Sequence, residues 1–227
     1  HMYKKIKLIL FFFSLIFFSS HLFANDKKYI NATDLIRSSN SALKIVASNE
    51  NLKFFKQYLR NAKAVLIFPQ LIEGGFFFGA KGGNGVLMIK KGKSWTGPFF
   101  YTMGGISLGL QLGVKTGELV MTVMSYRGLE SILKERLKFG VDIESAIATE
   151  GMGLSADSTV RLADVYTFSN NAGLFIGGSF DGSYIQPRND FNLALFKKEF
   201  SSEQILNSQE LHQSAQNIIN TLNEISD

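Results

Sequence analysis

GGFFFGAKGGNG, from Gly74 to Gly85, places three consecutive phenylalanines among glycines, with one lysine. A phosphate-binding loop of the GxxxxGK[ST] type needs lysine directly after its second glycine, but here Gly79 is followed by alanine. The GxGxxG pattern of dinucleotide-binding loops is also absent from this stretch. The stretch is therefore no nucleotide-binding loop, and we interpret it as a strand with a turn.

Successive side chains of a strand point to opposite faces of the sheet. Phe76 and Phe78 then face one way and Phe77 the other, which suits a strand that is covered on both faces. Gly82 to Gly85 supply the backbone freedom for a turn or a bulge, so Val86 to Ile89 is expected to form the next strand. Insertion of the phenylalanines into a membrane is the alternative interpretation.

Strand patterns continue on both sides of this stretch. Val65 to Phe68 is a continuous apolar run that ends at Pro69, as expected of a buried strand. In GISLGLQLGVK, Gly105 to Lys115, large apolar residues alternate with glycine and polar residues, which predicts one long strand in a sheet that can curl. Further strands are expected at Leu119 to Met124, at Val165 to Phe168 and at Leu174 to Ile185, the last two joined by a turn at Asn170 to Gly173.

Helical periodicity flanks the strand-rich region. Thr33 to Asn61 has apolar residues three to four positions apart, with an interruption at Ser48-Asn49, and predicts two amphipathic helices. Arg127 to Lys138 predicts a further helix by the same spacing. The capping-box spacing that begins at Ser201 predicts a C-terminal amphipathic helix over residues 201–227.

These patterns together predict an α+β fold. We expect a strongly curved, mostly antiparallel, glycine-rich sheet, or a barrel-like sheet, packed with amphipathic helices. A single domain is expected over residues 25–200, with a helical part at 33–61 and a strand-rich core at 62–190, followed by the C-terminal helix. A chain of 227 residues that is 45% apolar and 19% charged is long enough to bury such a core.

The N-terminal segment has the layout of a secretory signal peptide over residues 1–24. Lysines are followed by an apolar run from Leu8 to Phe18 and then by the small residue Ala24. The run is shorter than the ~20 residues of a spanning helix, so we expect cleavage near Ala24 and a periplasmic or secreted protein, with a retained membrane anchor as the alternative. Removing its three lysines lowers the formal net charge from +5 to +2, and nucleic acid is not expected as a partner.

Residue types that carry much catalytic and metal chemistry are missing from the centre of the sequence. The chain has no cysteine, and its histidines are His1, His21 and His212. Nucleophiles that need a histidine base and zinc sites built from cysteine and histidine are therefore excluded between Asn25 and Glu210. We expect no catalytic residues, no metal and no cofactor.

Clustered lysines provide one candidate for contact with anions. IKKGKSW places Lys90, Lys91 and Lys93 at a glycine-containing hairpin turn, with Trp95 just beyond it and Lys81 on the preceding connection. Lysine attracts phosphate and exposed tryptophan prefers a membrane interface, so these residues form a candidate lipid-binding site. The alternative is a solubilising turn with the tryptophan in the core.

A second basic surface lies on the predicted helical part. Its polar side carries Lys53, Lys56, Arg60 and Lys63, which suits contact with phospholipid headgroups. The alternative is a helix that covers the core and turns a solvated basic face outward.

The order of residues resembles that of a known family, the SYLF domain. The similarity lies in NAKAVLIFPQLIEGGFFFGAKGGNGVLMIKKGKSWTGPFFYTMGGISLGLQLGVKTGELVMTVMS, in GLESILKERLKFGVD and in VYTFSNNAGLFIGGSFDGSYIQPRND, and it covers about Asn61 to Asp190. The resemblance implies a mixed α/β fold with a curved sheet, no enzymatic activity, and binding to acidic phospholipids, which are phosphoinositides in the eukaryotic members. Some eukaryotic members also bind actin, and bacterial members of this kind are typically exported.

We therefore expect an exported, non-enzymatic protein that recognises anionic phospholipid headgroups at a membrane surface. A secreted protein-binding or actin-binding module is the second interpretation. An enzyme that acts on a lipid or a sugar is the third.

Overall fold

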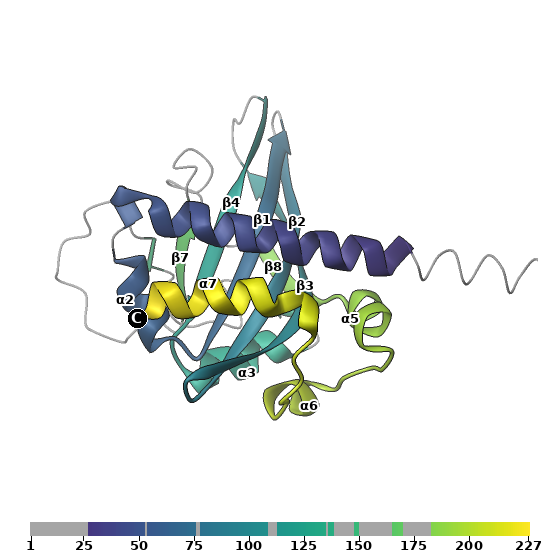
Figure 1. Ribbon diagram of the computed structural model, residues 1–227. Helices are drawn as coiled ribbons and strands as arrows, with labels where there is room; N and C mark the ends of the chain where they lie inside the picture. The colour runs from purple at the N-terminus through teal and green to yellow at the C-terminus, as the bar shows by residue number, and fades with distance from the viewer. Residues whose placement is uncertain are drawn as a thin grey trace, which may run out of the picture.

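The computed structural model describes residues 27–52, 54–75, 78–108, 113–134, 136–138, 148–149, 165–169 and 183–227. The described strands form one open sheet in the order β5-β8-β3-β2-β1-β4-β7-β6 (Figure 1). Its long strands are β1 (Ala64–Gly75), β2 (Phe78–Lys91), β3 (Ser94–Leu108) and β4 (Gly113–Val123). The short ones are β5 (Leu137–Lys138), β6 (Ala148–Thr149), β7 (Val165–Ser169) and β8 (Ser183–Pro187). Within this sheet β6 and β7 pair in parallel and the other neighbours are antiparallel.

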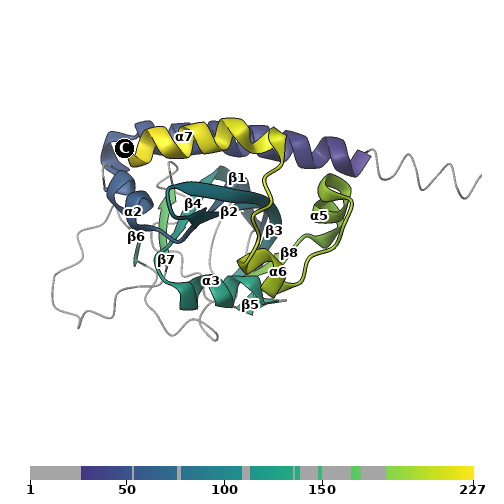
Figure 2. The same ribbon diagram turned by 60° about the horizontal axis from the view of Figure 1, so that its bottom comes forward.

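Helices cover both faces of this sheet, which confirms the α+β prediction. The N-terminal helix, described over residues 27–48, lies beside α7 (Gln216–Ser226) across one face, with α2 (Phe55–Asn61) at one end (Figure 1). Figure 2 shows the curved sheet between this layer and α3 (Tyr126–Leu133) with α6 (Ser202–Leu206). The remaining described elements are η1 (Glu50–Leu52), α5 (Asn189–Phe196) and η2 (Gln213–Ala215). None of the described helices is long and apolar enough to cross a membrane.

β1 is covered on both faces, as its apolar run predicts. Val65 and Ile67 join the core beneath the N-terminal helix, α2 and α7, whereas Leu66 and Phe68 join the core beneath α3 and α6. All four side chains are fully buried. Burial of such a side chain contributes roughly 1.5–3 kcal/mol to the free energy of folding. Because its side chains alternate between the two cores, β1 stabilises the packing of both helical layers on the sheet.

The prediction that this strand ends at Pro69 is wrong. β1 continues through Pro69 to Gly75, and its register with β4 shifts by one residue between Phe68 and Leu71. This is a β-bulge, which tolerates proline because the extra residue leaves the ladder of hydrogen bonds. Leu71 remains in the α3-side core, so the bulge turns Ile72 toward the face that carries the N-terminal helix.

Of the turn or bulge expected at Gly82 to Gly85, the turn is absent, because these residues lie inside β2, and they lie opposite the bulge of β1. The bulge of β1 explains the glycines: a β-carbon on Gly83 would lie 2.5 Å from the Gln70 carbonyl oxygen, and one on Gly85 would lie 2.7 Å from the Phe68 ring. Gly75 pairs with Gly79, so the chain reverses before Gly79, and Phe76 and Phe77 lie outside the described residues.

The stretch from Gly105 to Lys115 belongs to two strands rather than one. β3 ends at Leu108 and β4 begins at Gly113, and β2 and β1 lie between them in the sheet. Side chains alternate between the two faces in the same way at the end of β3 and at the start of β4. Periodicity therefore did not reveal that the chain changes strand here.

The capping box at Ser201 is present, but the single helix predicted beyond it is wrong. Ser201 N donates to Gln204 Oε1 over 2.8 Å, and Gln204 N donates to Ser201 Oγ over 3.2 Å. The helix stops because the following backbone binds β3: Gly97 N donates to Glu210 O and His212 N to Gly97 O. The chain then enters η2 and α7.

The other predicted elements are present in part. The interruption at Ser48-Asn49 is confirmed, and the helix predicted to reach Lys138 ends as α3 at Leu133, before β5. The end of the predicted strand Leu174 to Ile185 falls in β8, and its beginning and the turn at Asn170 to Gly173 lie outside the described residues.

Gly85→Ala is expected to lower the free energy of unfolding by about 1–3 kcal/mol, because its methyl group would overlap the Phe68 ring in a close-packed core. Gly82→Ala is the matched control on the same strand, since a β-carbon there meets only the Met103 carbonyl oxygen, at an ordinary 3.6 Å. Urea unfolding compares the two variants. Equal loss of stability in both would contradict the close approach at Gly85.

Candidate functional site

The predicted hairpin turn is present at Gly92 and Lys93, between β2 and β3. Gly92 has a φ of +63°, a conformation that glycine adopts without strain. Lys91 Nζ donates to the Leu206 carbonyl oxygen, and Lys90 Nζ donates to the Arg60 carbonyl oxygen over 2.7 Å. Two of the three lysines therefore hold neighbouring backbone, while Lys93 extends from the turn as an exposed side chain.

Trp95 and Lys81 do not join a surface site with this turn. Trp95 is 1% exposed and belongs to the core beneath the helices, so its expected role at a membrane interface is wrong. Lys81 lies within β2, is 8% exposed, and pairs with Gly105. At about 3.3 Å per strand residue it lies roughly 36 Å from the turn, too far to share a headgroup with Lys93.

Lys90 instead meets two other basic residues, at the end of α2 and just before β1. Its backbone N–H donates to the Lys63 carbonyl oxygen over 2.8 Å, and its side chain reaches the Arg60 carbonyl oxygen. Burial, followed by the positive charges of Lys63 and Arg60, lowers the pKa of Lys90. We call Arg60, Lys63 and Lys90 the basic cluster. The two charges that lower this pKa are both positive, so an anion placed beside them relieves their repulsion with Lys90.

Backbone carbonyl groups and an aromatic ring fix the geometry of the basic cluster. Arg60 Nε donates to the Ser226 carbonyl oxygen over 2.8 Å, which ties α2 to the end of α7. Lys63 N donates to the Val123 carbonyl oxygen over 2.7 Å. Lys63 Nζ lies 5.4 Å from the ring centroid of Tyr126, an exposed residue at the start of α3. The sequence had no signal for Tyr126, because a single tyrosine before a helix has no distinctive pattern.

The two basic groups predicted from the sequence thus meet through Arg60 and Lys90. Lys56 is exposed on α2, and Lys53 lies outside the described residues. The helix and the turn were separate candidates in the sequence, and antiparallel pairing of β1 with β2 brings them together.

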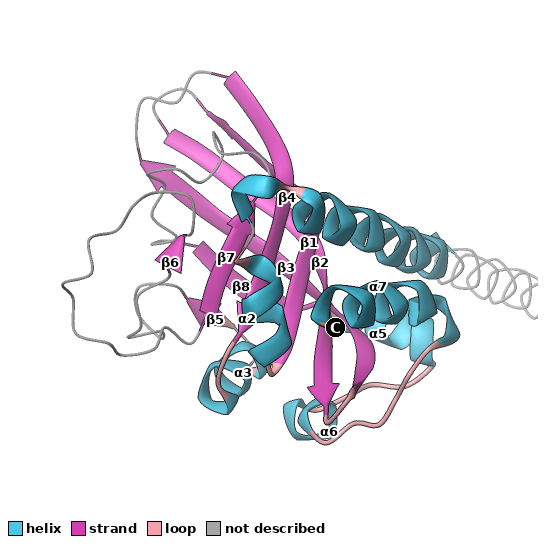
Figure 3. Ribbon diagram, turned by 60° about the vertical axis from the view of Figure 1, so that its left-hand side comes forward, coloured by secondary structure: helices cyan, strands magenta, loops and turns pink. Residues whose placement is uncertain are grey.

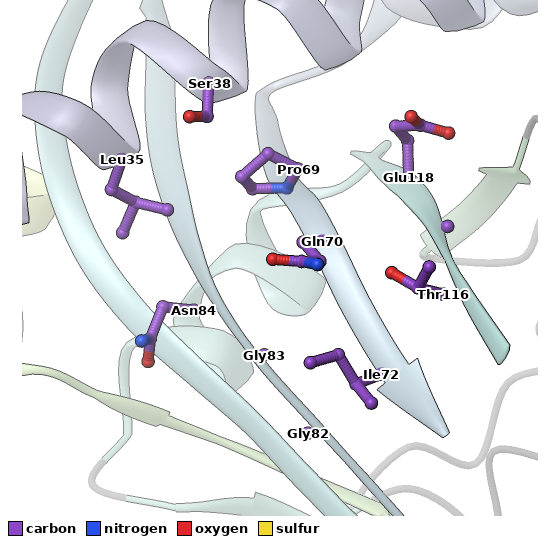
Figure 4. Close-up of a pocket in the computed structure, with 11 residues that line it drawn as sticks. Leu35, Ser38, Pro69, Gln70, Ile72, Gly82, Gly83, Asn84, Thr116 and Glu118 are labelled. Carbon is purple, nitrogen blue, oxygen red and sulfur yellow. The ribbon is translucent and has the colours of Figure 1, made fainter. Parts of the chain in front are cut away.

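An open pocket of about 760 Å³ is a second feature, which sequence reasoning missed (Figure 4). It lies where the helix-side face of the sheet emerges beside the N-terminal helix. Its lining comes from that helix (Leu35 and Ser38), from β1 (Pro69, Gln70 and Ile72), from β2 (Gly82, Gly83 and Asn84) and from β4 (Thr116, Gly117 and Glu118). The bulge in β1 places Pro69, Gln70 and Ile72 in this lining. No sequence motif predicted the pocket.

A hydrogen-bond network holds one wall of the pocket. Arg188 Nη1 donates to Asn84 Oδ1 over 2.8 Å, while its Nε and Nη2 donate to both carboxylate oxygens of Asp190. These hydrogen bonds hold the pKa of Asp190 below its usual value. Arg188 and Lys28 both pair with Asp190, and Glu118 is the one charged residue among those that line the pocket.

Metal chemistry has no support in the part of the chain that the structure describes. No group of three or more histidine, cysteine, aspartate or glutamate side chains lies close enough there to hold a metal ion.

Comparison with known families decides the relationship of this chain. A family model described as Ysc84, Las17-binding protein actin regulator, matches residues 104–225, from β3 to α7. The match covers more than half of the chain. The chain belongs to the Ysc84 family. This confirms the SYLF resemblance found in the sequence, and the basic cluster precedes the matched residues.

Curated relatives are similar to the chain at lower identity. SH3 domain-containing YSC84-like protein 1 of Xenopus laevis is 28% identical over 132 residues, which are 57% of this chain and 39% of that protein. The Homo sapiens protein of that name is 28% identical over 152 residues, 65% of this chain and 44% of its own. Protein YSC84 of Saccharomyces cerevisiae is 27% identical over 155 residues, 65% of this chain and 32% of its own. The chain thus spans less than half of each relative, and no solved structure matches it.

Lys63→Gln is expected to raise the pKa of Lys90 toward its ordinary value, because one of the two nearby positive charges is removed. NMR titration of the lysine side chains measures this shift. Lys93→Gln is the matched control, since Lys93 is not among the charges that act on Lys90. An unchanged pKa in Lys63→Gln would show that the basic cluster is looser than its hydrogen bonds indicate.

Proposed function

We propose that this Ysc84-family protein is an exported, non-enzymatic protein that binds anionic phospholipid headgroups through the basic cluster and Lys93. The observation that carries the proposal is the position of Lys90, whose pKa is lowered by burial and by the charges of Lys63 and Arg60. A phosphate group bound beside these side chains gains three favourable charge interactions and removes their mutual repulsion.

A local site is needed because the whole protein is weakly charged. The formal net charge falls to +2 once the N-terminal lysines are excluded, which gives little attraction over long distances. Basic residues close to an anionic membrane contribute about 1 kcal/mol each, within a Debye length of ~8 to 10 Å. Clustered cations therefore supply the affinity that the net charge lacks.

A protein partner is the second candidate function. The description of the matched family names Las17 binding and actin regulation, and the similar proteins of Xenopus laevis and Homo sapiens are named as SH3 domain-containing. In this interpretation the basic cluster binds an acidic protein surface, such as that of an actin filament, instead of a membrane.

Export predicts that the mature chain begins at or near Asn25, because the apolar run before it is too short to span a bilayer and ends near a small residue. Mass spectrometry of the protein recovered from its native compartment measures the N-terminus. Recovery of a membrane-bound chain that begins at Met2 would contradict export.

Lys63→Gln/Lys93→Gln is expected to weaken binding to anionic vesicles by about thirtyfold, the loss of roughly 2 kcal/mol from two basic residues near the membrane. Lys27→Gln/Lys44→Gln is the matched control, because it makes the same change of net charge at exposed positions of the N-terminal helix. Lys90 and Lys91 are left intact because their side chains hold backbone carbonyl groups. Cosedimentation with vesicles of phosphatidylglycerol and phosphatidylcholine measures binding, with circular dichroism as the folding control.

Equal binding by both double variants would overturn the proposed site. The lipid-binding proposal would be overturned if the wild-type protein did not bind anionic vesicles but cosedimented with actin filaments. The protein partner would then be favoured.

A further inference from the structure

The outer half of the sheet carries an apolar face that the described helices leave exposed. We define the outer half as residues 70–75 of β1, 78–84 of β2, 102–108 of β3 and 113–118 of β4, which project beyond the helices (Figure 1, Figure 3). Three large apolar side chains are exposed there: Ile72 by 46%, Ile106 by 65% and Val114 by 76%. Exposed apolar residues that gather on one surface indicate a binding site, whereas scattered ones do not.

Strand register places all three on the face that carries the N-terminal helix. Gly74 pairs with both Val114 and Ala80, and Ala80 pairs with Ile106, which makes one row across four strands. In the adjacent row Ile72 pairs with Thr116 and with Gly82. Paired residues share a face, and Ile72 and Gly82 also line the pocket beside the N-terminal helix.

Small residues make this face a groove. Ala80 and Gly82 on β2 form its floor, with Ile72 on β1 beside Gly82 and Ile106 on β3 beside Ala80. Across Gly82 from Ile72 lies Gly104, which the Tyr184 ring covers, since a β-carbon there would lie 2.6 Å from that ring. The backbones of β1 and β3 lie about 9.6 Å apart, twice the spacing of neighbouring strands, and these side chains narrow this space further. An α-helix with its side chains is about 10–12 Å across and is too wide to reach the floor. A single extended hydrocarbon chain is slim enough.

The groove opens at one end into the polar pocket. Gly82 and Ile72 belong to both, and beyond them lie the side chains of Gln70, Asn84 and Glu118 (Figure 4). Because the Asn84 Oδ1 accepts from Arg188, its amide nitrogen is left to donate to a ligand. The cavity therefore has an apolar part and a hydrogen-bonding part in series, which is the shape and polarity of a single-chain amphiphile.

The charge of the pocket restricts the head of such a ligand. Glu118 is the one charged residue among those that line the pocket, and the nearby cations Arg188 and Lys28 both pair with Asp190, so a negatively charged head would meet the Glu118 carboxylate and no cation of the lining. We propose that the groove and pocket bind a monoacyl lipid whose head is uncharged and bears hydroxyl groups, with the acyl chain along β2. This site differs in position and in charge preference from the basic cluster, and it does not depend on the proposed membrane contact.

The test uses 1-monomyristoylglycerol and myristate as probes, below their aggregation concentrations, with isothermal titration calorimetry on the chain from Asn25. Monomyristoylglycerol is expected to bind at least tenfold more tightly than myristate. The two probes have the same acyl chain, but the head of myristate is an anion. Glu118→Gln is expected to reduce that preference, because it removes the repelling charge.

Gly82→Leu is expected to weaken monomyristoylglycerol binding at least tenfold by filling the floor of the groove. The added side chain begins in open space, since a β-carbon there meets only the Met103 carbonyl oxygen at 3.6 Å. Gln57→Leu on the exposed side of α2 adds an apolar side chain elsewhere and is expected to bind like wild type. Circular dichroism confirms that both variants fold.

Wild-type binding by a folded Gly82→Leu variant would overturn the proposal, as would tighter binding of myristate than of monomyristoylglycerol. Vesicle binding separates this site from the basic cluster. Gly82→Leu is expected to bind anionic vesicles like wild type, and Lys63→Gln/Lys93→Gln to bind monomyristoylglycerol like wild type.

Discussion

The rest of the structure depends on the burial of β1 on both faces. Val65 and Ile67 face the N-terminal helix, α2 and α7, while Leu66 and Phe68 face α3 and α6. From Ala64 to Phe68 every residue of β1 is apolar, so neither face of this part can be left to water and elements distant in the sequence must cover both sides. The first helix and the last helix of the described chain accordingly meet on one face, where Thr221 Oγ1 donates to Asn40 Oδ1.

The bulge at Pro69 and Gln70 divides the sheet into two parts with different roles. Before it, both faces of β1 are covered, and the strand begins beside the basic cluster, where Lys63 and Lys90 are joined by a backbone hydrogen bond. After it, Ile72 turns to an uncovered face and the pocket opens between the strands and the N-terminal helix. One change of register thus gives the protein a basic end and an amphiphilic groove, each with a distinct ligand chemistry.

Local signals in the sequence predicted the buried strand, the two-residue turn at Gly92 and the capping box at Ser201, because each depends on residues close in the chain. The bulge at Pro69 and Gln70 and the two strands within Gly105 to Lys115 were missed, because the alternation of side chains does not show which neighbour a strand pairs with. The basic site was predicted only in parts. Lysine spacing found Lys90 and Arg60 separately, but the burial of Trp95 and the contact of Lys90 with Lys63 follow from tertiary packing.

In the proposed mode of binding, the basic end of the sheet, rather than its outer half, meets an anionic membrane. The chain has no cysteine, so spin labels can be placed on single cysteines introduced by Lys93→Cys and Val114→Cys, both at exposed positions. Electron paramagnetic resonance with a water-soluble relaxation agent then measures the depth of each label on vesicles of phosphatidylglycerol. We expect the label at position 93 to be shielded from the agent on binding, while the label at position 114 stays accessible. Shielding at position 114 with full access at position 93 would contradict this mode of binding.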